Sequence, residues 1–285
     1  MDVLLSLLLL TSIQIGPAAG GEEVIGHVSS RTIKPGESLI EIAPQYDVGF
    51  NAIAAANPGL DAFVPTPGAT VIIPTAWIVP RAAAPGTIVV NLSEMRLYLF
   101  PLGPGVPLTF PVGVGTEGWE TPLGTYTVVR KTVNPVWYPT PSIRREEPDL
   151  PAMVPPGPDN PLGTHALYLS KHTILIHGTN APFGVGRKAS HGCVRLYPED
   201  IPHLYRLVPV NTYVTIVREP VKVGLKNGQV YVEVHDDPDL KMDYHSEAVR
   251  LLAHRGLMGR VDDGKLDAAV EEHLGIPVDV SIDRS

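Results

Sequence analysis

The chain contains a single cysteine, Cys193, and the residues around it are of the kind that could make its thiol reactive. It lies in the run Ser190-His191-Gly192-Cys193-Val194-Arg195, two residues after His191 and sixteen after His177. A thiol attacks as its thiolate, and a nearby imidazole is the usual base that forms a thiolate near neutral pH. Gly192 keeps the backbone open, so its N–H or that of Cys193 could stabilise a developing oxyanion. These residues predict an acyl-transfer enzyme with a cysteine nucleophile.

The same residues allow two other assemblies. Cys193, His177 and His191 could bind tetrahedral zinc, but the sequence lacks an HExxH motif or a comparable pair of ligands on a helix. Cys193 could also be a buried structural cysteine, although its glycine, histidine, serine and arginine neighbours disfavour that role. We therefore predict no metal and no cofactor. The residues alone do not decide which histidine is the base, or whether Asn180 or a backbone carbonyl orients it.

The composition is that of a β-rich globular protein. Hydrophobic residues make up 44% of the 285 residues and charged residues 18%, as in ordinary globular proteins. The 30 prolines and 27 glycines indicate many turns. The net charge of -8 argues against a nucleic-acid partner, and a single cysteine excludes a disulfide scaffold.

The first twenty residues have the pattern of an export signal. An apolar run from Val3 to Leu10 precedes small residues from Gly16 to Gly20, and it is too short to span a bilayer. Asp2 and the absence of lysine or arginine before the run depart from the usual signal, and a buried N-terminal strand or helix is the alternative. We predict that residues 1–20 are a signal peptide and that the protein is exported.

Residues 30–74 have the pattern of a small α/β unit. Ser38 and Glu41 predict a capping box at the start of a helix. Pro44 should end or kink that helix, because its nitrogen cannot donate a hydrogen bond. The other expected elements are a strand, a second helix and a returning strand, at residues 31–33, 50–56 and 71–74.

After a linker expected at residues 75–86, apolar residues recur with a period of two, which predicts a mainly β domain over residues 87–218. The strand expected at residues 173–177 would deliver His177 at its end. Residues 113–118 match G-x-G-x-x-G, but a strand follows them instead of a helix, so we reject a dinucleotide site. The expected strands are at residues 87–92, 95–100, 107–112, 124–130, 164–169, 173–177 and 212–217, with a short helix from residue 198.

Two further segments lack this pattern. Residues 134–161 form a loop with nine prolines and the aromatic pair Trp137-Tyr138. We predict that this loop is a lid or one wall of a substrate groove, with an inert surface loop as the alternative. Residues 219–285 are predicted to form a C-terminal extension, a hairpin followed by two amphipathic helices, in which we find no catalytic motif.

The α/β unit resembles a LysM domain. The resemblance is carried by residues 32–39 (TIKPGESL), 55–58 (AANP) and 67–74 (PGATVIIP). It implies a βααβ fold that binds N-acetylglucosamine-containing glycan such as peptidoglycan. A degenerate module that only packs on the next domain is the alternative.

The cysteine motif resembles the signature of the YkuD-type L,D-transpeptidases. The matching runs are His177-Gly178-Thr179, Ser190 to Arg195, and Thr121-Pro122-Leu123-Gly124 at the start of a strand. The resemblance covers about residues 87–217 and implies a mainly β, sandwich-like catalytic domain. With the LysM-like unit ahead of this domain, the chain is similar to the ErfK/YbiS group of Gram-negative periplasmic enzymes.

This resemblance implies a two-step exchange on peptidoglycan stem peptides. Cys193 would attack the carbonyl of meso-diaminopimelate in a tetrapeptide stem and expel D-alanine, and an amine would then accept the acyl group. The acceptor is left open between a second stem peptide, which gives a 3→3 cross-link, and a lysine of an outer-membrane lipoprotein. Water as acceptor would make the protein an L,D-carboxypeptidase. A non-catalytic peptidoglycan-binding protein is a further alternative, which the intact His177 and Cys193 disfavour.

The resemblance also assigns roles to individual residues. It implies that His177 is the general base, that the carbonyl of Gly178 orients it, and that the N–H groups of Gly192 and Cys193 form the oxyanion hole. The other expected site residues either line and support the catalytic loop or contact the substrate: His191, Ser190 and Arg195 in the first group, and Trp137, Tyr138, Thr179 and Asn180 in the second.

Overall fold

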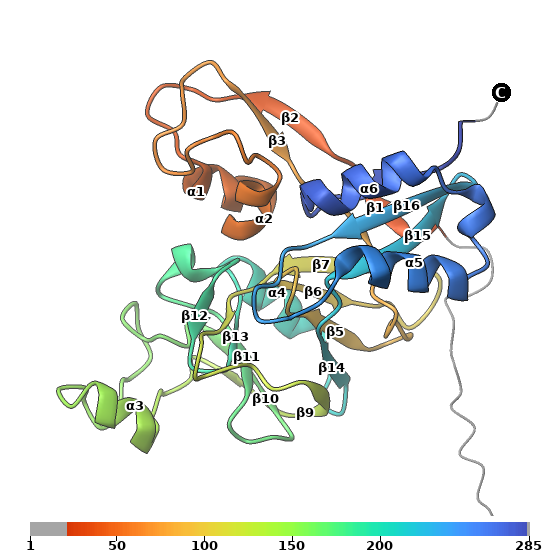
Figure 1. Cartoon of the computed structure of the whole chain (residues 1–285). Coiled ribbons are helices and arrows are strands. Elements are labelled where there is room, and N and C mark those ends of the chain that lie inside the picture. The colour runs from red at the N-terminus through yellow and green to blue at the C-terminus, as the bar shows by residue number, and fades with distance from the viewer. Residues whose placement is uncertain (1–21, 284–285) are drawn as a thin grey trace, which may run out of the picture.

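The computed structural model describes residues 22–283, which form three parts (Figure 1). A LysM-like part lies at the top left of the view, a mainly β part lies below it, and a C-terminal part lies to the right. The predicted signal peptide lies outside the described residues. Within residues 22–283, none of the helices has the length and apolar character needed to span a bilayer.

The LysM-like part has the expected βααβ order. Strand β2 (Ser29–Thr32) pairs antiparallel with β3 (Thr70–Ile73), and helices α1 (Leu39–Ile42) and α2 (Phe50–Ala55) come between them in sequence. Its core consists of apolar side chains from α1, α2 and β3 and from the segments that connect the elements. They include Ile33, Leu39, Ile42, Ile53, Val71 and Ile73.

The start and the end of α1 follow the sequence prediction. The carboxylate of Glu41 accepts a hydrogen bond from the backbone N–H of Ser38 (3.1 Å), so the capping box forms. Because Pro44 cannot continue the α-helical hydrogen bonds, α1 ends at Ile42 and a 3-10 turn (Ala43–Tyr46) follows.

One curled sheet of eight strands forms the central part, as the period-two pattern predicted. Its strands are β5 (Ile88–Asn91), β6 (Arg96–Leu99), β7 (Leu108–Pro111), β9 (Gly124–Val133), β10 (His165–Leu169), β11 (Leu175–His177), β13 (Val194–Arg195) and β14 (Tyr213–Val217). Their order is β13-β11-β10-β9-β14-β5-β6-β7. Neighbours are antiparallel except for the parallel pairs β13–β11 and β14–β5. The mainly β fold is therefore confirmed.

The chain beyond β7 returns to the opposite edge of the sheet. Gly113 exchanges two backbone hydrogen bonds with Arg195, at 2.8 and 2.9 Å. Next, β8 (Val114–Gly115) pairs parallel with β12 (Lys188–Ser190), and the chain enters β9 without an intervening helix. The G-x-G-x-x-G run is therefore a β connection, and the sheet curls so that its two edges meet beside Cys193.

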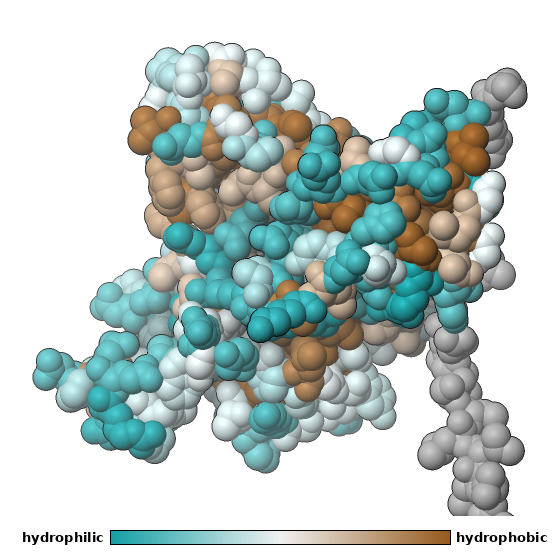
Figure 2. All heavy atoms as spheres, in the orientation of Figure 1, coloured by the Kyte–Doolittle hydropathy of each residue, from teal (hydrophilic) through white to brown (hydrophobic). Residues whose placement is uncertain are grey.

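The excursion at residues 134–161 contains a helix that the sequence analysis did not predict. Helix α3 (Pro141–Glu146) begins after Thr140, whose hydroxyl accepts a hydrogen bond from the N–H of Ile143 (3.4 Å). The excursion projects from the body of the molecule and its surface around α3 is hydrophilic (Figures 1 and 2). A longer helix, α4 (Asp200–Leu207), packs against β10 through Ile201 and Leu204.

The C-terminal part combines the predicted hairpin and helices with two elements that were not predicted. The hairpin is β15 (Val221–Lys226) and β16 (Gln229–Val234), and α5 (Tyr244–His254) and α6 (Asp263–Glu272) pack on it. A 3-10 turn (Met258–Arg260) joins the helices, and β17 (Val278–Asp279) adds a third strand to the hairpin.

The segment expected to be a linker begins with a buried strand. β4 (Ala76–Ile78) pairs antiparallel with β1 (Val24–Gly26), and all three residues of β4 are buried. The apolar side chains of Trp77 and Ile78 explain the difference, because they pack between the other parts instead of facing water. Residues 76–78 are thus a packed connection between the three parts.

Candidate active site around Cys193

Two parallel strands position the reactive residues. In the register of β11 and β13, His177 lies opposite Arg195, and Ile176 lies opposite Val194. Side chains two residues apart on a strand share a face, and Cys193 directly precedes β13. Cys193, Arg195 and His177 therefore belong to one face of the sheet.

His177 is held in one tautomer by the residue that follows it. Its Nδ1 lies 2.6 Å from the carbonyl oxygen of Gly178, and the side chain is 3% exposed. A carbonyl oxygen can only accept, so Nδ1 carries the hydrogen and Nε2 of the neutral ring is left with its lone pair. Burial, assisted by the charge of Arg195, lowers the pKa of His177 to about 3. The imidazole is therefore neutral, and able to accept a proton at Nε2, at physiological pH.

Gly178 is needed at this position for space. A Cβ atom there would lie 2.8 Å from the side chain of Ile201 in α4, which is closer than a real Cβ contact. A larger residue would push α4 away from the strand end or displace the carbonyl that orients His177.

The sulfur of Cys193 lies beside the start of β11, whereas His177 is the last residue of this strand. Sγ is 3.7 Å from the carbonyl oxygen of Thr173, and the structure describes no hydrogen bond between Sγ and His177. Burial raises the pKa of the Cys193 thiol above its usual range, although the N–H of Leu175 and the charge of Arg195 act in the opposite direction. The resting pair is therefore a neutral thiol and a neutral imidazole.

The loop that carries Cys193 is fixed by its own residues. The hydroxyl of Ser190, at the end of β12, donates a hydrogen bond to the carbonyl of Cys193 (2.6 Å). Gly192 has φ = 93°, a left-handed conformation that non-glycine residues seldom adopt. Together they form the tight turn that directs the chain into β13.

His191 is held by a residue that the sequence analysis did not select. Its Nε2 lies 3.2 Å from Oε2 of Glu146 at the end of α3. The other oxygen of this carboxylate accepts a hydrogen bond from Nε1 of Trp119 (3.1 Å), and the rings of Trp119 and His191 meet edge to face at 5.2 Å. Glu146 thus connects the proline-rich excursion to the catalytic loop. The Thr140-Pro141 pair, a cap followed by proline at the first helical position, is the sequence signal that could have revealed α3.

The residues expected to contact substrate are not all gathered at the sulfur. Thr179 is buried, and its hydroxyl accepts a hydrogen bond from the N–H of Ala181 (2.9 Å). Asn180 donates to the carbonyl of Asp159 (3.0 Å), so it is not the group that orients His177. In the excursion, Trp137 is half-buried and Tyr138 is 66% exposed.

Arg195 supplies the positive charge of the site. Its Nε atom is buried and has no hydrogen-bond partner within residues 22–283. Its charge lowers the pKa of both Cys193 and His177, although burial is the larger influence on each pKa. The charge of Arg195 therefore favours the thiolate that attacks, but it disfavours the imidazolium that His177 becomes when it accepts the thiol proton.

Comparison with known proteins gives the family. A model of the L,D-transpeptidase catalytic domain matches residues 85–223, and a model of the LysM domain matches residues 32–74. Probable L,D-transpeptidase YcfS of Escherichia coli (strain K12) is 38% identical over 91% of this chain and 86% of its own. Probable L,D-transpeptidase ErfK/SrfK of Salmonella typhimurium is 39% identical over 93% and 88%. The chain belongs to the L,D-transpeptidase family.

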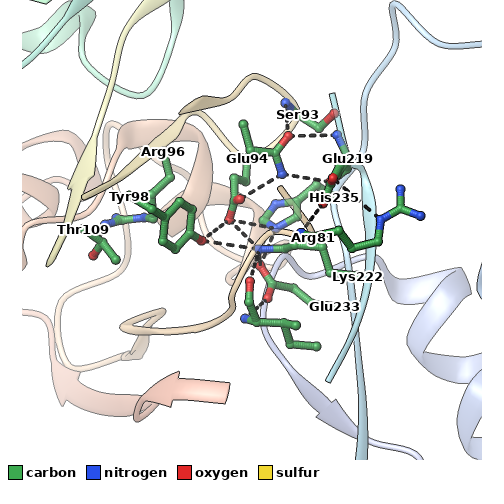
Figure 3. Close-up of polar contacts among 12 residues, drawn as sticks. Arg81, Ser93, Glu94, Arg96, Tyr98, Thr109, Glu219, Lys222, Glu233 and His235 are labelled. Carbon is green, nitrogen blue, oxygen red and sulfur yellow. Dashed lines mark hydrogen bonds and ion pairs between the residues drawn. The ribbon is translucent and has the colours of Figure 1, made fainter. Parts of the chain in front are cut away.

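This L,D-transpeptidase family member also contains a buried polar network outside the site (Figure 3). The ammonium group of Lys222 lies 2.7 Å from a carboxylate oxygen of Glu94 and 2.9 Å from one of Glu233. The hydroxyl of Tyr98 donates to Glu94 (2.7 Å), and Nε2 of His235 lies 2.6 Å from Glu233. The C-terminal part therefore shares buried charges with the β5–β6 hairpin. The sequence analysis did not predict this contact.

The same network contains a group of side chains, within the described residues, that could bind a metal ion. Ligand atoms of Glu94, Glu233 and His235 lie within 4.8 Å of one another. The ammonium group of Lys222 already lies between the two carboxylates and neutralises one of their charges. These residues therefore fit a buried lysine better than a metal ion.

Proposed function

We propose that this protein is a cysteine acyltransferase that replaces the terminal D-alanine of a peptidoglycan tetrapeptide stem by an amine. The observation that carries the proposal is the hydrogen bond between Nδ1 of His177 and the carbonyl of Gly178, since it leaves Nε2 free on a buried, neutral ring. Membership of the L,D-transpeptidase family supports the reaction class.

The first step forms a thioester. Sγ of Cys193 turns away from Thr173 by rotation about the Cα–Cβ bond and gives its proton to Nε2 of His177 as it attacks the carbonyl carbon of meso-diaminopimelate. The N–H groups of Gly192 and Cys193 stabilise the oxyanion that results. When the C–N bond to D-alanine breaks, the imidazolium returns the proton to the leaving amine. The products are free D-alanine and an acyl group on Cys193.

The second step transfers the acyl group. A neutral amine attacks the thioester carbon, His177 takes the proton of this amine, and the thiolate of Cys193 leaves and is protonated in turn. An amine of a second stem gives a 3→3 cross-link, and a lysine of an outer-membrane lipoprotein gives an attached protein. Attack by water gives the tripeptide of an L,D-carboxypeptidase.

The rest of the chain supports peptidoglycan as the partner. The LysM domain would bind the glycan strand that carries the stems. The export signal predicted at residues 1–20 would take the protein to the periplasm, where the stems are found. Neither role is needed for the chemistry of the thiol itself.

The test is incubation with disaccharide-tetrapeptide, followed by mass spectrometry of the intact protein and of the products. We expect a thioacyl adduct on Cys193, free D-alanine and a cross-linked dimer. Cys193→Ala and His177→Asn should abolish all three, whereas His172→Asn, a change at an exposed histidine outside the site, should leave them intact. Tripeptide without dimer would identify a hydrolase, and absence of adduct and product with retained binding to sacculi would refute both enzymatic functions.

A further inference from the structure

The LysM domain contacts the central part at the segment that carries the nucleophile. We call residues 47–51 the clamp segment and residues 185–197 the catalytic segment. Gly49 of the first and Gly186 of the second meet so closely that a Cβ atom on Gly49 would lie 2.7 Å from Cα of Gly186. Such an approach is possible only between two residues without side chains.

Hydrogen bonds hold the catalytic segment on both sides of Cys193. Ahead of it, the backbone N–H groups of Phe50 and Asn51 donate to the carbonyls of Val185 (3.4 Å) and Gly186 (3.1 Å). After it, the buried hydroxyl of Tyr197 donates to the carbonyl of Val48 (3.1 Å). The catalytic loop is therefore fixed at both ends by the same five residues of the LysM domain.

The clamp segment is itself anchored in the sheet. Arg96, 2% exposed, donates from Nη2 to the carbonyl of Asp47 (3.0 Å) and from Nη1 to the hydroxyl of Thr109 (2.9 Å). Its guanidinium lies over the ring of Trp77, 3.9 Å from the centroid. Asp47 adopts a left-handed conformation (φ = 55°), which turns its carbonyl toward this arginine. A buried arginine thus connects strand β6 to the clamp segment.

From these contacts we propose that the LysM domain positions the catalytic cysteine, in addition to any binding of glycan. A domain that only delivers substrate needs a flexible connection, whereas this one supports the loop that carries Cys193 from both sides. Small displacements of a nucleophile are costly, because attack requires close approach and alignment. The clamp segment should therefore be required for acyl transfer even on a stem peptide that carries no sugar.

Gly49→Ala tests the proposal, and Gly59→Ala is its matched control. Both glycines lie in the LysM domain without a positive φ, but a Cβ at Gly59 meets nothing within 4 Å. On a tetrapeptide without sugar, Gly49→Ala should lower kcat about tenfold with KM nearly unchanged, because the nucleophile and not the binding surface is displaced. In the full chain, hydrogen exchange of residues 188–195 should become about tenfold faster in Gly49→Ala alone.

Each outcome decides the proposal. It is overturned if Gly49→Ala speeds exchange at Phe50 and Asn51 while residues 188–195 and kcat stay as in the wild type. If Gly49→Ala fails to fold by circular dichroism, Tyr197→Phe replaces it, since it removes one hydroxyl, and the same two readouts should change by about threefold. The kinetic readout rests on the proposed acyl transfer. If the wild type forms no product, that function fails, and the exchange readout alone still decides whether the LysM domain holds the catalytic segment.

Discussion

The carbonyl oxygen of Gly178 lies 2.6 Å from Nδ1 of His177, the residue directly before it. The two histidines near Cys193 differ at Nε2, because that of His191 lies against Glu146, whereas that of His177 has no hydrogen-bond partner within residues 22–283. The burial of the same imidazole determines how the stability of the protein depends on pH.

Acidification should destabilise the protein between pH 6.5 and about 3. The pKa of His177 is about 3 in the folded state, against the usual 6.5 once the chain unfolds, so the unfolded state binds more protons in this range. The His177 contribution to the free energy of unfolding should fall by up to about 1.4 kcal/mol per pH unit. Urea unfolding at several pH values measures it. His177→Gln should flatten the curve, His172→Gln should not, and equal curves for all three proteins would contradict the assignment.

The thiol of Cys193 should be protonated at neutral pH. Since burial raises the pKa of Cys193, alkylation by iodoacetamide should be slow at pH 7 and should increase well into the alkaline range. The rate of mass increase, measured from pH 6 to 10, gives the titration midpoint, with Cys193→Ser as the unlabelled control. A midpoint below pH 7 would mean that a thiolate–imidazolium pair is already formed at rest.

Glu146→Gln should loosen the contact between the excursion and the catalytic loop. Its contact with His191 is half-exposed, and exposed polar contacts of this kind contribute about 1 kcal/mol or less, so we expect the excursion to open during turnover. We expect the ratio of hydrolysed tripeptide to cross-linked dimer to rise by up to about fivefold, because water gains access to the thioester. Glu147→Gln removes the same charge one residue away without touching His191, and should leave the ratio unchanged. The idea fails if both variants change the ratio equally.

Lys222→Met should strongly destabilise the fold. It would leave the buried carboxylates of Glu94 and Glu233 without their shared ammonium, and removing one partner of a buried charge cluster costs about 3–5 kcal/mol. Lys226→Met, on the same strand but half-buried and bonded only to the carbonyl of Gly26 (3.3 Å), should change the free energy of unfolding by no more than about 1 kcal/mol. Urea denaturation of both variants measures the difference. A loss below about 1 kcal/mol in Lys222→Met would show that the network is dispensable.

The fold was largely predictable because local signals and tertiary structure agree. The alternation of apolar residues in 87–100 becomes the β5–β6 hairpin, and Ser38 with Glu41 begins α1. Short elements escaped prediction where pairing comes from distant chain: β4 is a strand because β1 pairs with it, and two-residue β13 is one because β11 lies beside it. Two or three residues carry no periodicity to detect.

Within the site, motif residues were predictable and their partners were not. The residue types and spacing indicated Cys193 with two candidate histidines, whereas the choice of His177 over His191 and the role of the Gly178 carbonyl came from the family resemblance. Glu146 reaches His191 from forty-five positions away and has no motif of its own. Lys222 and Glu233 were missed for a different reason, since charged residues in a hairpin usually face water and these face each other in the interior.

Glu23, which directly precedes β1, connects the start of the described chain to the C-terminal part. Its carboxylate accepts from the N–H of Leu225 (2.8 Å) and from Arg255 (2.7 Å), which are 202 and 232 positions away in the sequence. Contacts between residues so far apart in the sequence form late in folding. The chain loses conformational entropy when it closes such a long loop, and this cost comes before the contact adds any stability. Proteins with many such contacts fold slowly. The hydrogen bonds of Glu23 can form only after the last hairpin and α5 have been synthesised. The protein should therefore remain loosely folded for longer than its helices alone would suggest.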